Sequence, residues 1–332
     1  MKVLLASSID GAAVDALEHS HDVTRAYNAS EDTLRSVIGD REVLVFRSGV
    51  SISAAVLKEA PDLRLLIRAG SGLDNVDLDF ARDHAITVVR VPGSSAQPVA
   101  EMTFAVLMTL VRKVALADRL LRKGHWPKAS LGGPLLTGKT LGIIGAGNIG
   151  SRVGEMAAAW GMRPIGCVAT SDATTNGAAE RLRSRGITLA DLPTVVAEAD
   201  FLSLHVPLDE TTWHLVDARL LSHMKRGSYL VNMARGGVVD EQALFPELTE
   251  GDTVLGAALD VHEREGEGTI SLFAELPNVV LTPHIGAMAL DSQRMIGERV
   301  LELVVAHEGD RLNDEVRDAE LVVSHFGEDR SS

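Results

Sequence analysis

The chain has 332 residues, of which 45% are hydrophobic, and it carries a formal net charge of −14 at pH 7. This length exceeds one ordinary core, so two domains are expected, and the apolar content excludes a disordered chain. The acidic balance disfavours nucleic acid and anionic membranes as partners, and the longest apolar stretch, residues 104–111, is too short to span a bilayer. The single cysteine, Cys167, excludes an intramolecular disulfide, as is typical of a cytoplasmic protein.

The N-terminal part alternates short apolar runs with helical patterns. The runs expected to form buried strands are residues 3–6, 22–24, 43–46, 65–67 and 86–89. The helical patterns between them are residues 12–17, 31–37, 54–59 and 78–84. Such alternation predicts a parallel, doubly wound sheet, which is complete near residue 92.

A long helix is predicted over residues 99–122, before a second unit of the same kind. That unit alternates again over residues 141–144, 165–168, 190–197, 201–205, 229–232, 254–259 and 279–282. A final helix, residues 290–307, is expected to cross back and pack on the first unit, which lacks closing helices of its own. We therefore expect one domain from residues 1–92 plus 290–332, a second from 93–289, and a frayed end at 327–332.

A glycine motif stands between the first strand of the second unit and a helical pattern. Gly145, Gly147 and Gly150 have the spacing G-x-G-x-x-G. The first allows a tight turn, the second lets the backbone approach a pyrophosphate, and the third lets helix pack on strand. The positive end of the helix favours the phosphates. This context predicts a dinucleotide site.

Further segments with side chains suited to catalysis or ligand binding follow strands of the second unit. Arg235 suits a carboxylate clamp, because its planar fork binds two oxygens at once, although a surface arginine is equally consistent. His284 is suited to proton transfer near neutral pH. Asp260 ends a strand, and Glu263 and Glu265 alone are more typical of a solvated loop. Other histidines are expected to be structural: His84, His205, His214 and His262.

Taken together and in order, these segments resemble the D-isomer-specific 2-hydroxyacid dehydrogenase family, most of all its phosphoglycerate dehydrogenases, over residues 40–305. The matching segments are 70–77, 145–150, 205–208, 232–240, 256–261 and 282–286. The resemblance implies an α/β fold of two doubly wound parallel-sheet domains. A Rossmann cofactor domain would be inserted into a flavodoxin-like substrate domain, with substrate in the cleft between them and usually a homodimer.

The resemblance also implies roles for residues. Arg235 would bind the substrate carboxylate and carbonyl, His284 would be the acid/base and Glu265 its partner. Cofactor contacts would be Gly145, Gly147, Asn148, Ile149, Gly150, Val168, Pro207, Thr212, Met233, Ala234, Asp260, Gly286 and Ala287. Substrate contacts would be Arg47, Ser48, Arg68, Ser71 and Gly72. The two arginines would suit a phosphorylated or dianionic substrate, with ordinary surface charge as the alternative, and no metal is implied.

The sequence departs from the family pattern at several places. Gly266 stands where a proline usually follows the catalytic acid, which leaves Glu263 as a weaker alternative to Glu265. Val168 occupies the position of the acid that holds the ribose, so NAD(H) is favoured with NADP(H) as competitor. Residues 169–171 would offer hydrogen bonds to a 2′-phosphate, and Asp172 is a substitute acid. After His307 there is no room for a regulatory domain, so serine feedback is not expected.

We therefore expect a cytoplasmic oxidoreductase that acts on the CH–OH group of a D-2-hydroxy acid, or in reverse on its 2-oxo partner. Within this class, a glyoxylate/hydroxypyruvate reductase is the alternative to a phosphoglycerate dehydrogenase. From another class, a catalytically silent, NAD(H)-sensing corepressor-like protein would keep the cofactor site and bind protein partners instead.

Overall fold

A computed structural model describes the chain except for residues 93–94, 169–176, 313–315, 317–320 and 324–332. The expected frayed end therefore lies outside the described residues, as do residues 169–172. The chain forms two compact units, one of Met1–Ser95 with Met288–Ser332 and one of Ala96–Ala287. These boundaries fall within a few residues of the expected ones.

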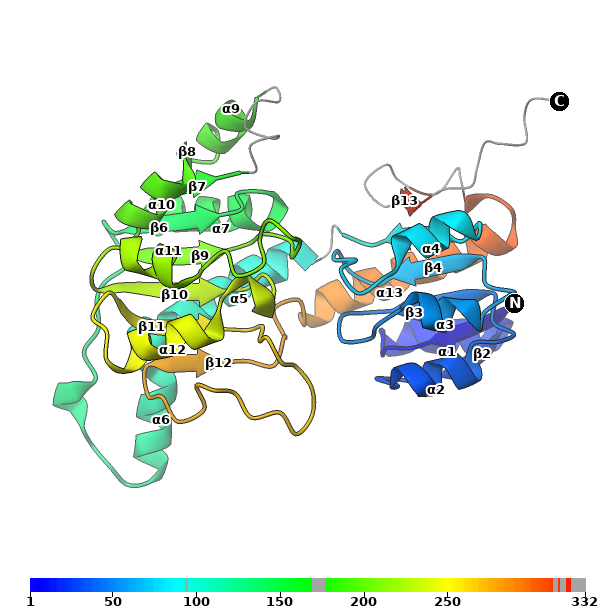
Figure 1. The fold of residues 1–332 in the computed structure, drawn as a ribbon, viewed down its shortest axis with the longest axis horizontal. Helices are drawn as coiled ribbons and strands as arrows, with labels where there is room; N and C mark the ends of the chain where they lie inside the picture. The colour runs from blue at the N-terminus through cyan, green and yellow to red at the C-terminus, as the bar shows by residue number, and fades with distance from the viewer. Residues whose placement is uncertain (93–94, 169–176, 313–315, 317–320, 324–332) are drawn as a thin grey trace. The chain divides into compact units, whose positions relative to one another are not determined.

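The first unit is built on a six-stranded sheet in the order β13-β5-β4-β3-β1-β2 (Figure 1). Its parallel strands are β1 (Lys2–Leu5), β2 (Asp22–Arg25), β3 (Val43–Phe46), β4 (Leu65–Arg68) and β5 (Thr87–Arg90). Its connecting helices are α1 (Gly11–Ser20), α2 (Glu31–Val37), α3 (Ala54–Lys58) and α4 (Leu78–Asp83). The predicted alternation is confirmed. An antiparallel edge strand, β13 (Leu321–Val323), was not predicted.

Side chains explain why the helices of the first unit begin where they do. Asp10, Ser30, Ser53 and Asp77 precede α1 to α4, and each accepts a hydrogen bond from a backbone N–H of the first turn. Such caps satisfy N–H groups that a helix start leaves without a partner. The short polar residue before each apolar pattern therefore sets each helix start.

The C-terminal helix α13 (Leu290–Glu308) packs on the first unit, as predicted. It approaches α1 closely at Gly297, where an added Cβ would lie 3.0 Å from the Ala13 Cβ. The apolar face of α13 joins the core of β1, β3 and β4 through Ile296, Val300, Leu303 and Val304. The late segment therefore completes a sheet face that the N-terminal segment leaves uncovered.

The second unit contains a seven-stranded parallel sheet in the order β12-β11-β10-β9-β6-β7-β8. Its strands are β6 (Thr140–Ile144), β7 (Arg163–Cys167), β8 (Thr188–Leu189), β9 (Phe201–Leu204), β10 (Ser228–Asn232), β11 (Val254–Leu259) and β12 (Val279–Leu281). Separate apolar clusters cover its two faces. One involves α5 (Ala96–Val111) and α7 (Asn148–Ala159); the other involves α10 (Leu192–Glu198), α11 (Ala218–His223) and α12 (Glu241–Thr249). The predicted doubly wound fold is confirmed.

The single helix predicted over residues 99–122 is wrong, because the chain breaks between α5 and α6 (Val114–Arg122). Lys113 at the break has φ +53°, and its Nζ donates to the Ser130 carbonyl. The backbone at Gly133 lies so close to the Val111 carbonyl that an added Cβ would be 1.7 Å from its oxygen. A continuing helix would need that space, so the chain turns. Whereas α5 is largely buried, α6 has no buried residue and stands off from the sheet (Figure 1).

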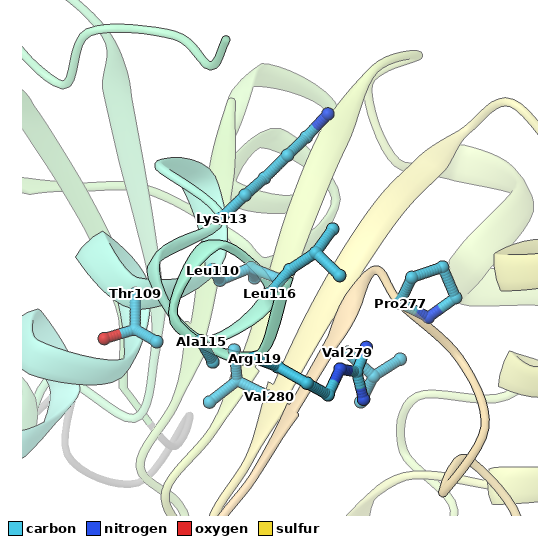
Figure 2. A pocket seen from close by; sticks show the side chains of 9 residues that line it. All are labelled: Thr109, Leu110, Lys113, Ala115, Leu116, Arg119, Pro277, Val279 and Val280. Carbon is cyan, nitrogen blue, oxygen red and sulfur yellow. The ribbon is translucent and has the colours of Figure 1, made fainter. Parts of the chain in front are cut away.

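A hollow of about 240 Å³ lies where this break meets the edge strand β12 (Figure 2). It is lined by Thr109, Leu110, Lys113, Ala115, Leu116, Arg119, Pro277, Val279 and Val280. None of these residues belongs to the candidate site. Within the described part of the chain, no helix combines the length and apolar character needed to cross a membrane.

Candidate active site

The glycine motif forms an open turn at the start of α7. Gly145 has φ +92°, and an added Cβ there would lie 2.6 Å from the His205 carbonyl oxygen, so only glycine fits. Gly147 is the N-cap residue of α7, and no atom lies within 4 Å of the position its Cβ would take. The first turn of α7 carries no acidic residue. The N–H groups of Asn148 and Ile149 thus begin a helix whose positive end suits a pyrophosphate.

Residues expected near a nicotinamide ring lie together in the second unit. Met233 and Ala234 are buried just after β10, and Asp260 is buried just after β11. An added Cβ at Gly286 would lie 2.9 Å from both Asp260 Oδ2 and Met233 Cε. Ala287 also packs against the apolar cluster that contains Met233. This grouping and the open turn fit a dinucleotide cofactor.

Three other expected cofactor contacts lie in two loops that follow strands. The Thr212 hydroxyl donates to the Pro207 carbonyl at 2.7 Å and so closes the loop after β9. Val168, directly after β7, is half-buried against the apolar cluster of its unit. It therefore offers no carboxylate to a ribose. The alternatives at residues 169–172 lie outside the described residues.

The structure brings His284 and Glu265 into direct contact. His284 Nδ1 lies 2.9 Å from Glu265 Oε2, and both side chains are partly exposed. Burial opposes ionisation of Glu265, but hydrogen bonding and charge interaction with His284 outweigh it, together with an N–H bond from His262. The pKa of Glu265 is thereby lowered, so this residue is a carboxylate at neutral pH.

The alternative acid, Glu263, is engaged elsewhere. Its Oε1 lies 2.9 Å from His214 Nε2 and accepts the backbone N–H of Glu241 at 3.2 Å. The geometry therefore distinguishes the two acids that the sequence left open, with Glu265 as the partner of His284.

Asp260 builds the turn that carries His284. Its Oδ1 accepts the Thr282 hydroxyl at 2.6 Å and the Ile285 N–H at 2.9 Å, and its Oδ2 accepts the Gly286 N–H at 2.8 Å. The His284 N–H donates to the Asp260 carbonyl at 2.7 Å. His284 itself has φ +54°, a conformation uncommon for a side-chain-bearing residue. The family resemblance implied a cofactor contact for Asp260 and did not reveal these bonds to the turn.

Arg235 follows β10 at the same edge of the sheet. Asn232, Leu259 and Leu281 are aligned across β10, β11 and β12, so the segments after these strands begin side by side. The Asn232 side chain holds its own segment, donating to the Arg235 carbonyl at 2.9 Å. Arg235 is half-buried, and its Nη1 donates to the Ala234 carbonyl at 2.8 Å. Arg235, Glu265 and His284 thus follow neighbouring strands, next to β9 and the glycine-motif strand β6.

In the first unit, Arg47 directly follows β3 and is half-buried. Its backbone is fixed, because its N–H donates to Ser7 Oγ and its carbonyl accepts from Asn75. Burial lowers the pKa of its guanidinium, and no residue among those described forms a hydrogen bond or ion pair with that group. A charged group buried without a protein partner is suited to an anionic ligand. The neighbouring Ser48 is exposed.

Arg68 is bonded to the turn that follows its own strand, β4. It is buried, its Nε donates to the Gly72 carbonyl at 2.7 Å, and its Nη1 donates to the Ala69 carbonyl at 3.3 Å. Gly70 has φ +153°, and an added Cβ there would lie 2.9 Å from Nη1. The Ser71 hydroxyl is within 2.8 Å of Ser95 Oγ. Arg68 therefore braces this turn through its guanidinium, whereas no described residue bonds to the guanidinium of Arg47.

The histidines expected to be structural have clear packing or bonding partners. His205 is half-buried with Nε2 2.8 Å from Ser203 Oγ, and burial of the ring lowers its pKa to about 3. His84 stacks on Phe80. His262 Nε2 lies 3.0 Å from the Thr282 carbonyl, joining the loops that carry Glu265 and His284. No signal in the sequence revealed that link.

Comparison with known proteins gives a consistent result. The family model described as "D-isomer specific 2-hydroxyacid dehydrogenase, NAD binding domain" matches residues 104–286. A hydroxypyruvate reductase of Thermotoga maritima is 39% identical over 276 residues, which is 82% of this chain and 87% of that protein. A D-3-phosphoglycerate dehydrogenase of Methanocaldococcus jannaschii is 36% identical over 305 residues, 92% of this chain but 57% of that longer protein.

Among solved structures, a D-lactate dehydrogenase of Aquifex aeolicus complexed with NAD and lactic acid has a TM-score of 0.84. It is 27% identical, and the match covers 98% of this chain and 99% of that one. The fold therefore agrees across both units, and the family model covers most of the second. The chain belongs to the D-isomer specific 2-hydroxyacid dehydrogenase family.

Proposed function

We propose that the protein is an NAD(H)-dependent oxidoreductase that interconverts a D-2-hydroxy acid and its 2-oxo acid, in the manner of a D-3-phosphoglycerate dehydrogenase. The observation that carries this proposal is the 2.9 Å contact between His284 and Glu265. It lies at the sheet edge that also bears Arg235 and the open turn at Gly147. Proton transfer, carboxylate binding and dinucleotide binding are the three tasks this reaction requires.

His284 is proposed as the acid/base. Because its Nδ1 faces Glu265, Nε2 is the ring atom left to exchange a proton with the substrate oxygen. The protonated ring neutralises charge that develops on the carbonyl oxygen during reduction, and the neutral ring takes the proton back during oxidation. The Glu265 carboxylate fixes the ring orientation and offsets the imidazolium charge. When bound, the nicotinamide supplies or accepts the hydride.

Arg235 is proposed to bind the substrate carboxylate, because a guanidinium can hold two oxygens with parallel hydrogen bonds. In the first unit we propose Arg47 as a ligand for a further anionic group, with Ser48, Ser71 and Gly72 as the remaining substrate contacts. The unpartnered, partly buried guanidinium of Arg47 supports this role. Arg68 is proposed to act indirectly, by shaping the turn that presents Ser71.

For the cofactor we propose NAD(H), held by the turn from Gly145 to Gly150 and by the residues around Met233 and Gly286. The name of the matching family model supports NAD. Val168 leaves NADP(H) as the alternative, since no carboxylate there repels a 2′-phosphate. The preference for NAD(H) over NADP(H) is therefore measured in the substrate panel described below.

A second candidate is a glyoxylate/hydroxypyruvate reductase. One observation favours it: the match to the Thermotoga hydroxypyruvate reductase covers 87% of that protein. The corepressor-like alternative is not favoured, because Arg235, Glu265 and His284 are retained together and Glu265 contacts His284.

We also propose a cytoplasmic homodimer without nucleic-acid partners. The exposed Val114 and Leu121 on α6, a helix with no buried residue, support association with a second copy. The net charge of −14 is unfavourable for nucleic acid. The only cysteine is buried and unpaired, as suits a reducing compartment.

The test is a substrate panel with both nicotinamide cofactors. Purified protein is assayed with 3-phosphoglycerate plus NAD or NADP, and with hydroxypyruvate, glyoxylate and pyruvate plus NADH or NADPH. Turnover that is highest with 3-phosphoglycerate supports the first candidate, and turnover highest with hydroxypyruvate or glyoxylate supports the second. No turnover on any of these acids overturns both.

A further inference from the structure

The loop that carries Glu265 has little intrinsic rigidity. Gly266 and Gly268 follow the acid with φ +131° and +82°, and an added Cβ at either would meet nothing within 4 Å. Neither residue is thus held by packing around it. Since Glu265 must remain beside His284 to orient it, some other contact has to hold this loop.

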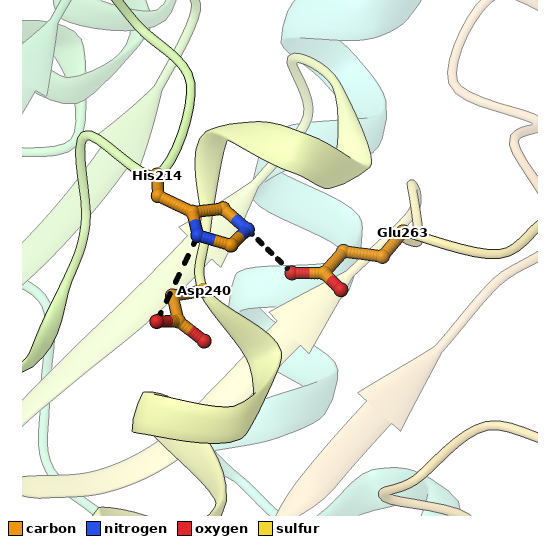
Figure 3. Close-up of side chains that lie close together, drawn as sticks. All are labelled: His214, Asp240 and Glu263. Atoms are coloured by element: carbon orange, nitrogen blue, oxygen red, sulfur yellow. Dashed lines mark hydrogen bonds and ion pairs between the residues drawn. The ribbon is translucent and has the colours of Figure 1, made fainter.

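His214 makes such a contact from a different loop. Its imidazole lies between two carboxylates, with Nε2 2.9 Å from Glu263 Oε1 and Nδ1 3.8 Å from Asp240 Oδ2 (Figure 3). Its ring stacks on Trp213 at 4.5 Å, and the Trp213 ring rests against Gly237. The imidazole is therefore held by stacking on the Trp213 ring and by one acid near each of its nitrogens.

The backbone of His214 is in an unfavourable region for its residue type. It has φ +50°, and its N–H donates to the Gly237 carbonyl at 2.8 Å. Glycine would adopt this conformation without strain, whereas a residue with a Cβ is strained there. A strained position occupied by a side chain with two charged partners indicates a use for that side chain.

The contacts continue from His214 to the catalytic pair. Glu263 is tied to α12 in both directions, because its N–H donates to Glu241 Oε1 at 3.0 Å and its Oε1 accepts the Glu241 N–H. Two residues later, Glu265 Oε1 accepts the His262 N–H while its Oε2 faces His284. Fixing Glu263 thus limits how far Glu265 can move.

We propose that His214 is a positioning residue that, through Glu263, holds the Glu265 carboxylate against His284. This inference rests on the proposed function of that pair. A metal site made of His214, Asp240 and Glu263 fits less well, although their ligand atoms lie within 4.8 Å of one another. The acids face opposite nitrogens of the ring, so one ion cannot bind His214 between them (Figure 3).

The decisive variant is His214→Gly, which removes the imidazole and relieves the backbone. We expect kcat to fall about threefold to tenfold, the scale of one hydrogen-bonded ion pair, while the KM for the cofactor stays unchanged. The matched control is His223→Gln, because among the described residues that histidine bonds only within α11. A kcat equal to that of the control would overturn the proposal.

A nuclear magnetic resonance measurement tests the same point without turnover. The downfield Nδ1–H signal of His284, assigned by its loss in His284→Gln, reports the bond to Glu265. It should broaden through exchange with water in His214→Gly and in Glu263→Gln, and stay sharp in His223→Gln. A signal that is unchanged in both loop variants overturns the positioning role of His214, even if the wild-type protein turns over no acid. If turnover is absent but the signal broadens, only the proposed function is overturned.

A double variant and a zinc titration complete the test of this proposal. If His214 acts through Glu263, the double variant His214→Gly/Glu263→Gln should be no slower than the worse single variant, and additive losses would contradict that route. Titration with zinc ion followed by thermal unfolding covers the metal alternative. A zinc-dependent rise in Tm that is lost in His214→Gly would contradict the positioning role of His214 and indicate a metal site instead.

Discussion

Each sheet has an arginine at or just after the end of one of its strands, and the two arginines differ in burial and in contacts. In the first unit, Arg68 is buried and donates to two carbonyls of the turn that follows its own strand. In the second unit, Arg235 is half-buried at an edge that also carries the His284–Glu265 pair. Arg68 thus braces a turn with two of its donors, whereas Arg235, whose Nη1 donates to the Ala234 carbonyl, is the arginine proposed to bind substrate.

The same contrast holds for acids of the second unit. The carboxylates of Asp260 and Glu263 accept hydrogen bonds from backbone N–H groups and contact side chains of neighbouring loops. Glu265 gives one oxygen to a backbone N–H and turns the other to an imidazole. Glu265 is thus the acid in contact with His284, and Glu263 is the acid in contact with His214.

The largest expected effect is that of His284→Ala. Loss of the acid/base should lower kcat by about 10²–10⁴, while the dissociation constant of NADH, measured by fluorescence, stays unchanged because the glycine motif is intact. His84→Ala, in the first unit, is the control. A kcat within a few-fold of wild type would assign the proton transfer to another group.

Arg235→Ala should be nearly as damaging and should act on the substrate. Removing a charge-assisted clamp costs about 2–5 kcal/mol, or roughly 30-fold to several-thousand-fold in kcat/KM for a 2-oxo acid. Arg235→Lys should recover only part of this loss, since an ammonium lacks the planar fork. Unchanged kinetic constants in Arg235→Ala would show that Arg235 does not bind the substrate carboxylate.

Replacing the first-unit arginines tests the distinction between brace and ligand. Arg68→Met leaves the Gly72 and Ala69 carbonyls without their donor and should lower the free energy of unfolding by about 1–3 kcal/mol, measured in urea. Arg47→Met should leave stability within about 0.5 kcal/mol and raise KM for 3-phosphoglycerate more than for pyruvate. The reverse pattern would exchange their assigned roles.

His205 should make stability depend on pH. Burial lowers its pKa to about 3, so between that value and the usual 6.5 the unfolded chain binds a proton that the folded chain does not. Unfolding then takes up a proton, and stability falls as pH drops from 6.5 toward 3, by up to about 1.4 kcal/mol per pH unit. Urea unfolding across this range should show a shallower slope for His205→Gln. Equal slopes would mean that the imidazole is not shielded.

The smallest expected effect is on the choice of cofactor. Val168→Asp introduces a carboxylate after β7 that can accept from a ribose 2′-hydroxyl and repel a 2′-phosphate. The ratio of kcat/KM for NAD to that for NADP should rise by about tenfold, an energy of about 1.4 kcal/mol. Val168→Asn, without the charge, is the matched control. An unmoved ratio would place ribose recognition elsewhere.

Much of the fold could be predicted because both faces of each sheet are buried. The apolar runs at residues 43–46 and 254–259 coincide with β3 and β11, and the pattern at 31–37 coincides with α2. The break at Lys113 could not be predicted, since it depends on a contact with Gly133 that is distant in sequence. The edge strand β13 was also not predicted, although Leu321–Val323 is a short apolar run.

The site could be predicted only where a motif carries the information. Spacing and family resemblance indicated Arg235, Glu265 and His284, and the geometry separates Glu265 from Glu263. The tasks of Arg68 and His214 depend on carbonyls, positive φ values and carboxylates that only the folded chain brings together. Such partners leave no local pattern in the sequence.

The most direct test of the central claim follows the transferred atom. NADH with both hydrogens at C4 of the nicotinamide replaced by deuterium is incubated with the protein and hydroxypyruvate, and the product is analysed by mass spectrometry and on a chiral column. The account predicts a D-2-hydroxy acid with deuterium at C2, formed by the wild-type protein and reduced at least about 100-fold in His284→Ala. An L-product, a product without deuterium, or equal rates for both proteins would contradict it.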